Sequence, residues 1–188
     1  MNYIDVLEKI LDPHDVKVGG GSAAALSGAM SAGLIGMVAL LSVGRDCGWD
    51  DADYLSAESR CSILRQRLLL GAVADAEAYG QITSAYKLPK NDEPEKEARR
   101  AAIEAAGLAA ASVPRDNAVC CREIYDLGVQ LKEKSNRNAA SDLMYGLELA
   151  RLGVLGCVAN IEANLPLIKS GCLVNQFTNM VKKLTEGV

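Results

Sequence analysis

The chain has 188 residues, of which 49% are hydrophobic and 23% charged, and its formal net charge is −4. This length and composition are typical of a globular protein with a substantial core, and we treat residues 1–188 as one domain. The acidic balance and the dispersed Lys and Arg residues argue against a nucleic-acid partner.

Helical patterns cover most of the chain, and no segment has the pattern of a strand. With one Phe and one Trp, the core must be built from Ala, Leu, Val, Ile and Gly, which favours closely packed helices. Helices are expected at about 3–11, 23–43, 51–86, 94–134, 141–168 and 173–184. Asn2 is expected to cap the first helix, and Pro114 to kink or break the fourth. The sequence predicts an all-α fold, a single-domain bundle of long helices.

The second of these helices follows a run of three glycines, Gly19, Gly20 and Gly21. Ser22 is expected to be its N-cap, and the alanines after it are strong helix formers. Free backbone N–H groups at such a helix start favour an anion or a carbonyl oxygen. The spacing is neither that of a nucleotide P-loop nor that of a dinucleotide-binding turn. Two interpretations remain, a tight turn into a buried helix and a loop that contacts a ligand.

No charged residue occurs between Lys17 and Arg45. One face of this segment carries the large residues Leu26, Met30, Leu34, Met37 and Leu41, and another the small residues Ala25, Gly28, Ala29, Ala32, Gly33 and Gly36. Small residues at helical spacing let another helix backbone approach closely. Residues 18–44 are long enough to cross a bilayer, but Ala, Gly and Ser dominate them and no other segment resembles a second span. Three acidic residues precede the apolar run, unlike an export signal. We therefore expect a helix of a bundle and no membrane partner.

The six cysteines include no Cys-x-x-Cys pair, and Cys120 and Cys121 are adjacent. Cys47, Cys61, Cys157 and Cys172 lie among apolar neighbours, as small buried thiols do. A reduced, cytoplasmic protein is therefore expected. His14 is the only histidine, so no metal site is expected. Proton transfers in an enzyme of this composition would use carboxylate, lysine or tyrosine groups.

Two aspartates occupy unusual helix positions. Asp75 belongs to a stripe with 3–4 residue spacing that comprises Leu68, Ala72, Asp75, Tyr79, Ile82 and Tyr86. A carboxyl group on such a face must be paired, hydrogen-bonded or protonated, and it is either structural or functional. Asp142 follows Ser141 in a first helical turn, where an acid also suits the helix dipole. The face below Asp142 carries Gly146, Leu149, Gly153, Gly156, Asn160 and Asn164, which is typical of a lined cleft.

Lys87 and Lys90 end the Asp75 helix, where lysines also suit the helix dipole. Lys87 lies about 18 Å from Asp75 along a straight helix. If both residues serve one site, a ligand must span this distance or a second subunit must supply one of them.

Together these segments resemble the cyclodeaminase/cyclohydrolase family over nearly the whole chain. The motifs that carry the resemblance are Gly-Gly-Gly-Ser-Ala-Ala-Ala at 19–25, Asp-Ala-x-Ala-Tyr at 75–79, Lys-Leu-Pro-Lys at 87–90, Val-Pro at 113–114, Asn-x-Asn-Ala-x-Ser-Asp at 136–142 and the Asn160…Asn164-Leu165 helix. This family includes the cyclodeaminase domain of formiminotransferase-cyclodeaminase and small bacterial methenyltetrahydrofolate cyclohydrolases. The resemblance implies an all-helical homodimer with a tetrahydrofolate derivative bound in a groove near the subunit interface.

The resemblance implies one of two reactions, neither of which needs a cofactor beyond tetrahydrofolate as the substrate. A cyclohydrolase adds water to 5,10-methenyltetrahydrofolate and gives 10-formyltetrahydrofolate. A cyclodeaminase closes 5-formiminotetrahydrofolate to the methenyl compound and releases ammonia. These 188 residues contain no formiminotransferase part, which favours the cyclohydrolase. A helical dimer that binds folate or a partner without catalysis is the alternative of another class.

For the reaction we expect Asp142 or Asp75 to be the acid/base and the electrostatic partner of the positive carbon. Lys87 is the third candidate for the catalytic centre, and with Lys90 it is placed to hold the glutamate carboxylates of folate. The expected substrate-binding residues are Gly19, Gly20, Gly21, Ser22, Lys90, Asn138, Ser141 and Asn160. We expect the glycine turn and both aspartates to face a common pocket.

Overall fold

The computed structural model describes residues 1–188 and contains helices but no strand, which confirms the predicted all-α class. The six α-helices are α1 (Tyr3–Leu11), α2 (Gly20–Leu40), α3 (Asp51–Tyr86), α4 (Glu93–Leu131), α5 (Ala140–Asn164) and α6 (Gly171–Thr185). Two short 3-10 helices, η1 (Arg137–Ala139) and η2 (Leu165–Leu167), flank α5. All six predicted helices are present.

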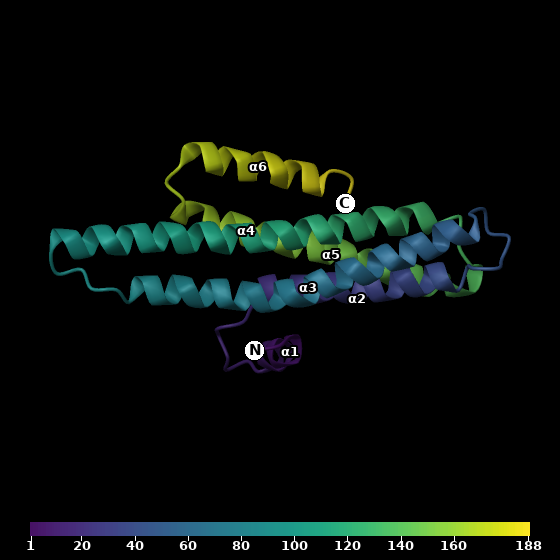
Figure 1. Ribbon diagram of the computed structural model, residues 1–188, viewed down its shortest axis with the longest axis horizontal. Coiled ribbons are helices and arrows are strands. Elements are labelled where there is room, and N and C mark those ends of the chain that lie inside the picture. The colour runs from purple at the N-terminus through teal and green to yellow at the C-terminus, as the bar shows by residue number, and fades with distance from the viewer.

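Helices α2, α3, α4 and α5 form a bundle in which α2 contacts the other three. Helix α1 packs against α3 and α2, while α6 lies on α5 and α4 at the other side of the bundle (Figure 1). The loop end of the α3–α4 hairpin projects beyond the other helices (Figure 1). This projection leaves one face of α3 uncovered next to the end of the bundle.

Small residues allow α2 and α5 to pack with their backbones close together. The hydroxyl of Ser31 on α2 donates a hydrogen bond of 2.6 Å to the carbonyl oxygen of Gly146 on α5. A Cβ atom at Gly153 would lie 3.1 Å from the carbonyl oxygen of Ala24 and 2.8 Å from the Cys121 sulfur. The predicted small-residue face of α2 is thus the face that packs into the bundle.

Some large apolar residues of α2 are exposed, whereas Ile35 and Val38 are buried in the core. Met30 is 56% exposed and Met37 is 38% exposed. On the neighbouring α5, Met144, Tyr145 and Leu152 are also exposed. These side chains define an apolar surface, which we call the α2–α5 face.

Two helical segments, residues 20–40 and 137–167, are long and apolar enough to cross a membrane. The second corrects our expectation that no other segment has this character. About half of each apolar window is buried inside the bundle, as in the core helices of soluble proteins. These helices are apolar largely because they pack inside the bundle.

Three local predictions were wrong in whole or in part. Ser22 does not cap α2, because the helix begins at Gly20 and Ser22 is buried within its first turn. Of the two outcomes expected at Pro114, a kink or a break, the break does not occur, because Pro114 lies buried inside one continuous helix. Cys172 is exposed on α6, whereas Cys61 and Cys157 are buried as expected, and all six cysteines are free thiols. The Cys172 error arises because α6 covers the bundle with only one of its faces.

Buried polar groups fix the end of the bundle that carries the start of α5. Ser42 accepts a hydrogen bond from the backbone N–H of Asn136, and the Asn136 side chain donates to the Leu41 carbonyl oxygen. The phenol of Tyr54 donates a bond of 2.7 Å to the carbonyl oxygen of Lys134. The predicted turn at 136–138 is present, and these bonds tie it to α2 and α3.

Candidate active site

A cavity of about 270 Å³ lies where the start of α2, the second half of α3 and the end of α5 meet, and α4 contributes Ala110 to its wall. Its lining consists of Gly19, Gly20, Gly21, Asp75, Tyr79, Ile82, Ala110, Asn160, Ala163 and Asn164. The fold therefore brings together the glycine turn, Asp75 and Asn160, which are far apart in the sequence. Helix α2 has no side-chain cap, so its first backbone N–H groups are available at this cavity.

Gly21 is the glycine that the cavity requires. A Cβ atom there would lie 2.5 Å from Asp75 Oδ1 and would also overlap the amide nitrogen of Asn160. A Cβ atom at Gly19 or Gly20 would meet nothing within 4 Å. The missing side chain at Gly21 thus lets the Asp75 carboxyl and the Asn160 amide lie next to the same backbone position.

Ser22 holds the Asp75 carboxyl group. Its Oγ lies 2.9 Å from Asp75 Oδ2 and 3.0 Å from the carbonyl oxygen of Ala72. A hydroxyl has one proton, so it cannot donate fully to both acceptors at once. When Asp75 is protonated, it donates to Ser22 Oγ, and Ser22 then donates to Ala72. The neutral acid therefore also has a complete set of partners.

Burial makes the charged form of Asp75 less favourable than it is in water. Burial raises the pKa of Asp75 above its ordinary value, and the hydrogen bonds from Ser22 oppose that rise without cancelling it. No lysine, arginine or histidine forms a salt bridge with Asp75. The cavity consequently contains a partly buried carboxyl group with no positive partner of its own.

A proline in α4 determines how Asn160 is oriented. Pro114 has no backbone N–H, so the carbonyl oxygen of Ala110 loses its normal helical donor. Asn164 Nδ2 donates to this oxygen at 3.1 Å and also lies 3.1 Å from Asn160 Oδ1. Because Asn160 Oδ1 accepts from Asn164, Asn160 Nδ2 is the atom turned toward Gly21 and Asp75. The cavity wall thus presents an amide donor beside a carboxyl acceptor.

The other predicted site residues lie outside this cavity. Asn138, Ser141 and Asp142 are at the opposite end of α5, with Asp142 about 27 Å from Asn160 along the helix. One chain therefore does not form the expected common pocket for both aspartates. Lys87 and Lys90 follow the end of α3 and are exposed.

The predicted site residues did not include five residues of the lining, Tyr79, Ile82, Ala110, Ala163 and Asn164. Tyr79 and Ile82 lie four and seven positions after Asp75, so helical spacing alone could have found them. Ala163 follows Asn160 by three positions and could have been found in the same way. Pro114 indicates that the carbonyl of Ala110, four positions earlier, lacks its helical donor, but the contact with Asn164 across two helices has no sequence signal.

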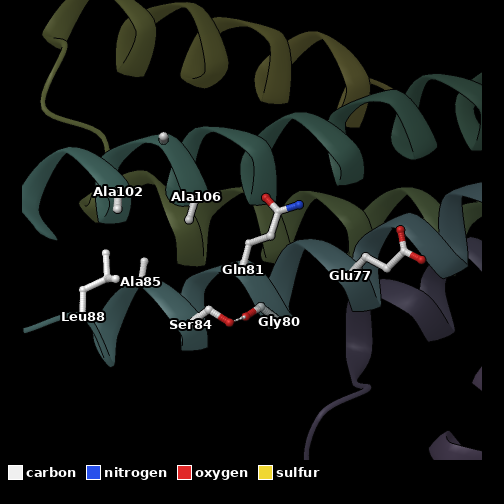
Figure 2. A pocket seen from close by; sticks show the side chains of 9 residues that line it. Glu77, Gly80, Gln81, Ser84, Ala85, Leu88, Ala102 and Ala106 are labelled. Carbon is white, nitrogen blue, oxygen red and sulfur yellow. Dashed lines mark hydrogen bonds between the residues drawn. The ribbon is translucent and has the colours of Figure 1, made fainter. Parts of the chain in front are cut away.

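A larger hollow of about 680 Å³ lies between α3 and α4 in the projecting hairpin (Figure 2). Glu77, Gln81 and Leu88 line it from a face of α3 different from that of Asp75. Alanine side chains form much of the rest of the wall. The polar side chains of the hollow are those of Glu77, Gln81 and Ser84. The Asp75 cavity is the better candidate, because it holds a partly buried carboxyl group with a raised pKa.

The fold and the cavity define a helical-bundle protein whose cavity holds a partly buried carboxyl group. No group of three or more His, Cys, Asp or Glu side chains comes together that could hold a metal ion. The chain belongs to the formiminotransferase-cyclodeaminase family, whose sequence profile matches residues 4–183. This match confirms the resemblance found in the sequence motifs.

Named relatives fall into two groups. Methenyltetrahydrofolate cyclohydrolase of Methylorubrum extorquens is 39% identical over 148 residues, which cover 78% of this chain and 71% of that protein. Formimidoyltransferase-cyclodeaminase of Rattus norvegicus is 30% identical over 152 residues, which cover 78% of this chain and 27% of that protein. The chain thus matches most of the first relative and about a quarter of the second.

A crystal structure of formiminotetrahydrofolate cyclodeaminase from Thermotoga maritima has the same fold. The superposition has a TM-score of 0.82 and covers 99% of this chain and 89% of that chain, with 22% sequence identity. At this identity the likeness establishes the architecture.

We expect Asn164→Ala to destabilise the protein by about 1–2 kcal/mol, because it leaves the buried Ala110 carbonyl unpaired. Pro114→Ala restores a backbone N–H for that carbonyl. Asn164→Ala should therefore cost less in a Pro114→Ala background, which a double-mutant cycle of denaturant unfolding measures. Equal costs in both backgrounds would show that the proline and the asparagine act independently.

We expect Asp75→Asn to stabilise the fold at neutral pH. A folded-state pKa above the unfolded value means that the native state binds more protons, so Asp75 lowers stability as pH rises through that interval. The difference in melting temperature between variant and wild type should accordingly shrink as the pH falls below the ordinary aspartate range. A variant that is less stable than wild type at every pH would contradict this account.

Proposed function

We propose that this protein hydrolyses 5,10-methenyltetrahydrofolate to 10-formyltetrahydrofolate. The observation that carries the proposal is the Asp75 carboxyl group, partly buried in the cavity with no cationic side chain to neutralise it. The methenyl carbon of the substrate belongs to a positively charged amidinium group. A carboxylate without its own counterion stabilises such a cation more than one already paired with lysine or arginine.

The reaction needs positioning and proton transfer. Water attacks the methenyl carbon, the new C–O bond forms, and the carboxylate takes the water proton. The tetrahedral carbon then carries a hydroxyl group, N5 and N10. Protonation of N5 allows the C–N5 bond to break, and loss of the hydroxyl proton leaves a formyl group on N10. Asp75 is placed to accept the first proton and to return it to N5, while Asn160 Nδ2 is placed to donate to the developing oxygen.

Cyclodeamination of 5-formiminotetrahydrofolate is the second candidate. It is supported by the formimidoyltransferase-cyclodeaminase relatives and proceeds through a similar tetrahedral carbon, with ammonia as the leaving group. We prefer the cyclohydrolase reaction, because the chain matches the 39% identical methenyltetrahydrofolate cyclohydrolase over most of its length. Neither reaction requires a cofactor beyond the folate substrate, and either fits a cytoplasmic protein whose thiols stay reduced.

The methenyl chromophore in the near ultraviolet tests these functions directly. Loss of absorbance with the protein supports hydrolysis, and growth of absorbance from 5-formiminotetrahydrofolate supports cyclodeamination. We expect Asp75→Asn to lower kcat by at least about 100-fold with a smaller change in KM. No activity in either assay, with folate still protecting the protein against heat, would favour the non-catalytic binding protein instead.

We also propose that the protein is a homodimer joined through the α2–α5 face. Met30 and Met37 on α2 and Met144, Tyr145 and Leu152 on α5 are exposed large apolar side chains on two adjacent helices. Helix α2 has no charged residue, and Glu148, which lies on α5 between Met144 and Leu152, is paired with Arg151 of the same helix at 3.7 Å. The two faces of a two-fold dimer are identical, which suits a self-complementary apolar surface such as the α2–α5 face.

This dimer offers a role for Asp142. A two-fold axis across the helices makes the two copies of α5 antiparallel, so the start of one α5 lies near the end of the other. Asp142, Ser141 and Asn138 of one subunit are then brought toward the cavity that Asp75 and Asn160 form in its partner. On this arrangement the two aspartates act in one site, although in one chain Asp142 lies about 27 Å along α5 from Asn160, which lines the Asp75 cavity.

Mixed dimers test the shared site. Asp75→Asn and Asp142→Asn chains are each expected to be nearly inactive, with kcat reduced far more than binding. Unfolding and refolding an equimolar mixture should restore about a quarter of wild-type activity, because half of the dimers are hybrids and each hybrid has one intact site. No recovery in hybrids that have been shown to form would mean that both aspartates act within one chain or that Asp142 has no catalytic role.

A further inference from the structure

The cavity is smaller than the proposed substrate. At about 270 Å³ it falls just below the usual 300–1,000 Å³ range of pockets that enclose small molecules. Tetrahydrofolate consists of a pteridine head, an aminobenzoyl arm and a terminal glutamate. The cavity has room for the head, so the arm and the glutamate must lie on a surface next to it.

One wall of the cavity continues beyond it as an apolar surface of α3. Asp75, Tyr79 and Ile82 line the cavity, and Tyr86 follows on the same helical face. Tyr79 and Tyr86 are each 48% exposed. The uncovered part of α3 thus presents two tyrosine rings and an isoleucine in a row.

Tyr86 is held in place from α4. The Arg99 guanidinium lies 5.4 Å from the centre of the Tyr86 ring, and its Nη2 donates a bond of 3.1 Å to the Tyr86 carbonyl oxygen. Arg99 forms no salt bridge with a carboxylate. A partly exposed ring next to an arginine without an acidic partner is a suitable contact for an aromatic group that carries a carboxylate.

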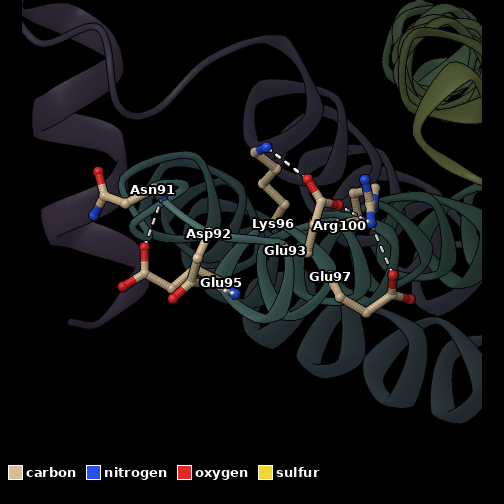
Figure 3. A network of polar contacts seen from close by, with 7 residues as sticks. All are labelled: Asn91, Asp92, Glu93, Glu95, Lys96, Glu97 and Arg100. Atoms are coloured by element: carbon tan, nitrogen blue, oxygen red, sulfur yellow. Dashed lines mark hydrogen bonds and ion pairs between the residues drawn. The ribbon is translucent and has the colours of Figure 1, made fainter.

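The acidic residues at this end of the hairpin already have partners (Figure 3). Glu93 pairs with Lys96 at 2.6 Å, Glu97 pairs with Arg100 at 2.8 Å, and Glu95 accepts a bond from the backbone of Asn91. Lys87 and Lys90 take part in no salt bridge. Three basic side chains without an acidic partner, those of Lys87, Lys90 and Arg99, therefore lie near Tyr86.

We propose that Tyr79, Ile82 and Tyr86 bind the aminobenzoyl arm of the folate, and that Arg99, with Lys87 and Lys90, binds its glutamate carboxylates. This inference rests on the proposed folate reaction. Tyr86 lies about 16 Å from Asp75 along α3. The side chains of Tyr79, Ile82 and Tyr86, which we call the α3 strip, therefore span the distance between the acid and the lysines. The tyrosines determine specificity for the arm and take no part in the proton transfers.

Fragments of the substrate separate this role from catalysis. N-(4-aminobenzoyl)-L-glutamate represents the arm, and 6-methyltetrahydropterin represents the head. For Tyr86→Ala we expect the inhibition constant of the arm fragment and the KM of the substrate to rise about 3- to 10-fold, with kcat little changed. The inhibition constant of the pterin fragment should not change, and Tyr86→Phe should retain most of the binding.

Tyr3→Ala is the matched control, because Tyr3 is similarly exposed but lies on α1. The strip is overturned if the arm fragment does not bind the wild type, if Tyr86→Ala binds it as the wild type does, or if both fragments weaken together. If the wild type has neither activity but binds the arm fragment in a Tyr86-dependent way, the proposed reactions fail and the strip stands. Calorimetry reports fragment binding when no turnover is available.

Discussion

The absence of side chains at a few positions of α2 and α5 is the constraint on which the site depends. Because Gly153 has no Cβ, α5 approaches the backbone of α2 at Ala24. This approach brings the end of α5 next to the start of α2, where Gly21 leaves space for two polar groups. Asp75 from α3 and Asn160 from α5 fill that space. The same close packing that builds the core therefore assembles the cavity.

Two features of the cavity are unfavourable for stability and are compensated differently. Pro114 removes a hydrogen bond from α4, and Asn164 replaces it with one from α5. The substitute bond crosses between helices, so it also fixes the amide of Asn160. The buried carboxyl of Asp75 has only neutral partners, and a raised pKa is the result. Asp75 has no positively charged partner in the protein, and a cationic substrate can supply one.

Much of this arrangement could be predicted from the sequence, because helix periodicity and proline positions are local signals. The ends of α1 and α3 and the turn at 136–138 follow from caps, prolines and spacing. The start of α2 was misplaced because Ser22 looks like a cap, whereas its hydroxyl bonds to a helix fifty residues away. Pro114 was expected to kink or break α4, and the break was among the expectations because a sequence does not show that Asn164 satisfies the freed carbonyl. Likewise, the separation of Asp142 from Asp75 follows from which ends of the long helices meet.

The charge distribution explains why substrate and cavity would bind in a defined orientation. The uncompensated carboxyl of Asp75 attracts the positive amidinium, whereas Lys87, Lys90 and Arg99 at the end of α3 attract carboxylates. A folate has these opposite charges at separate points along its length, with an aromatic ring between them. Reversing the substrate would place like charges together at both ends and would remove the ring from Tyr79 and Tyr86. Orientation therefore follows from the order of charges along one face of α3, and the cavity itself has only to recognise the head.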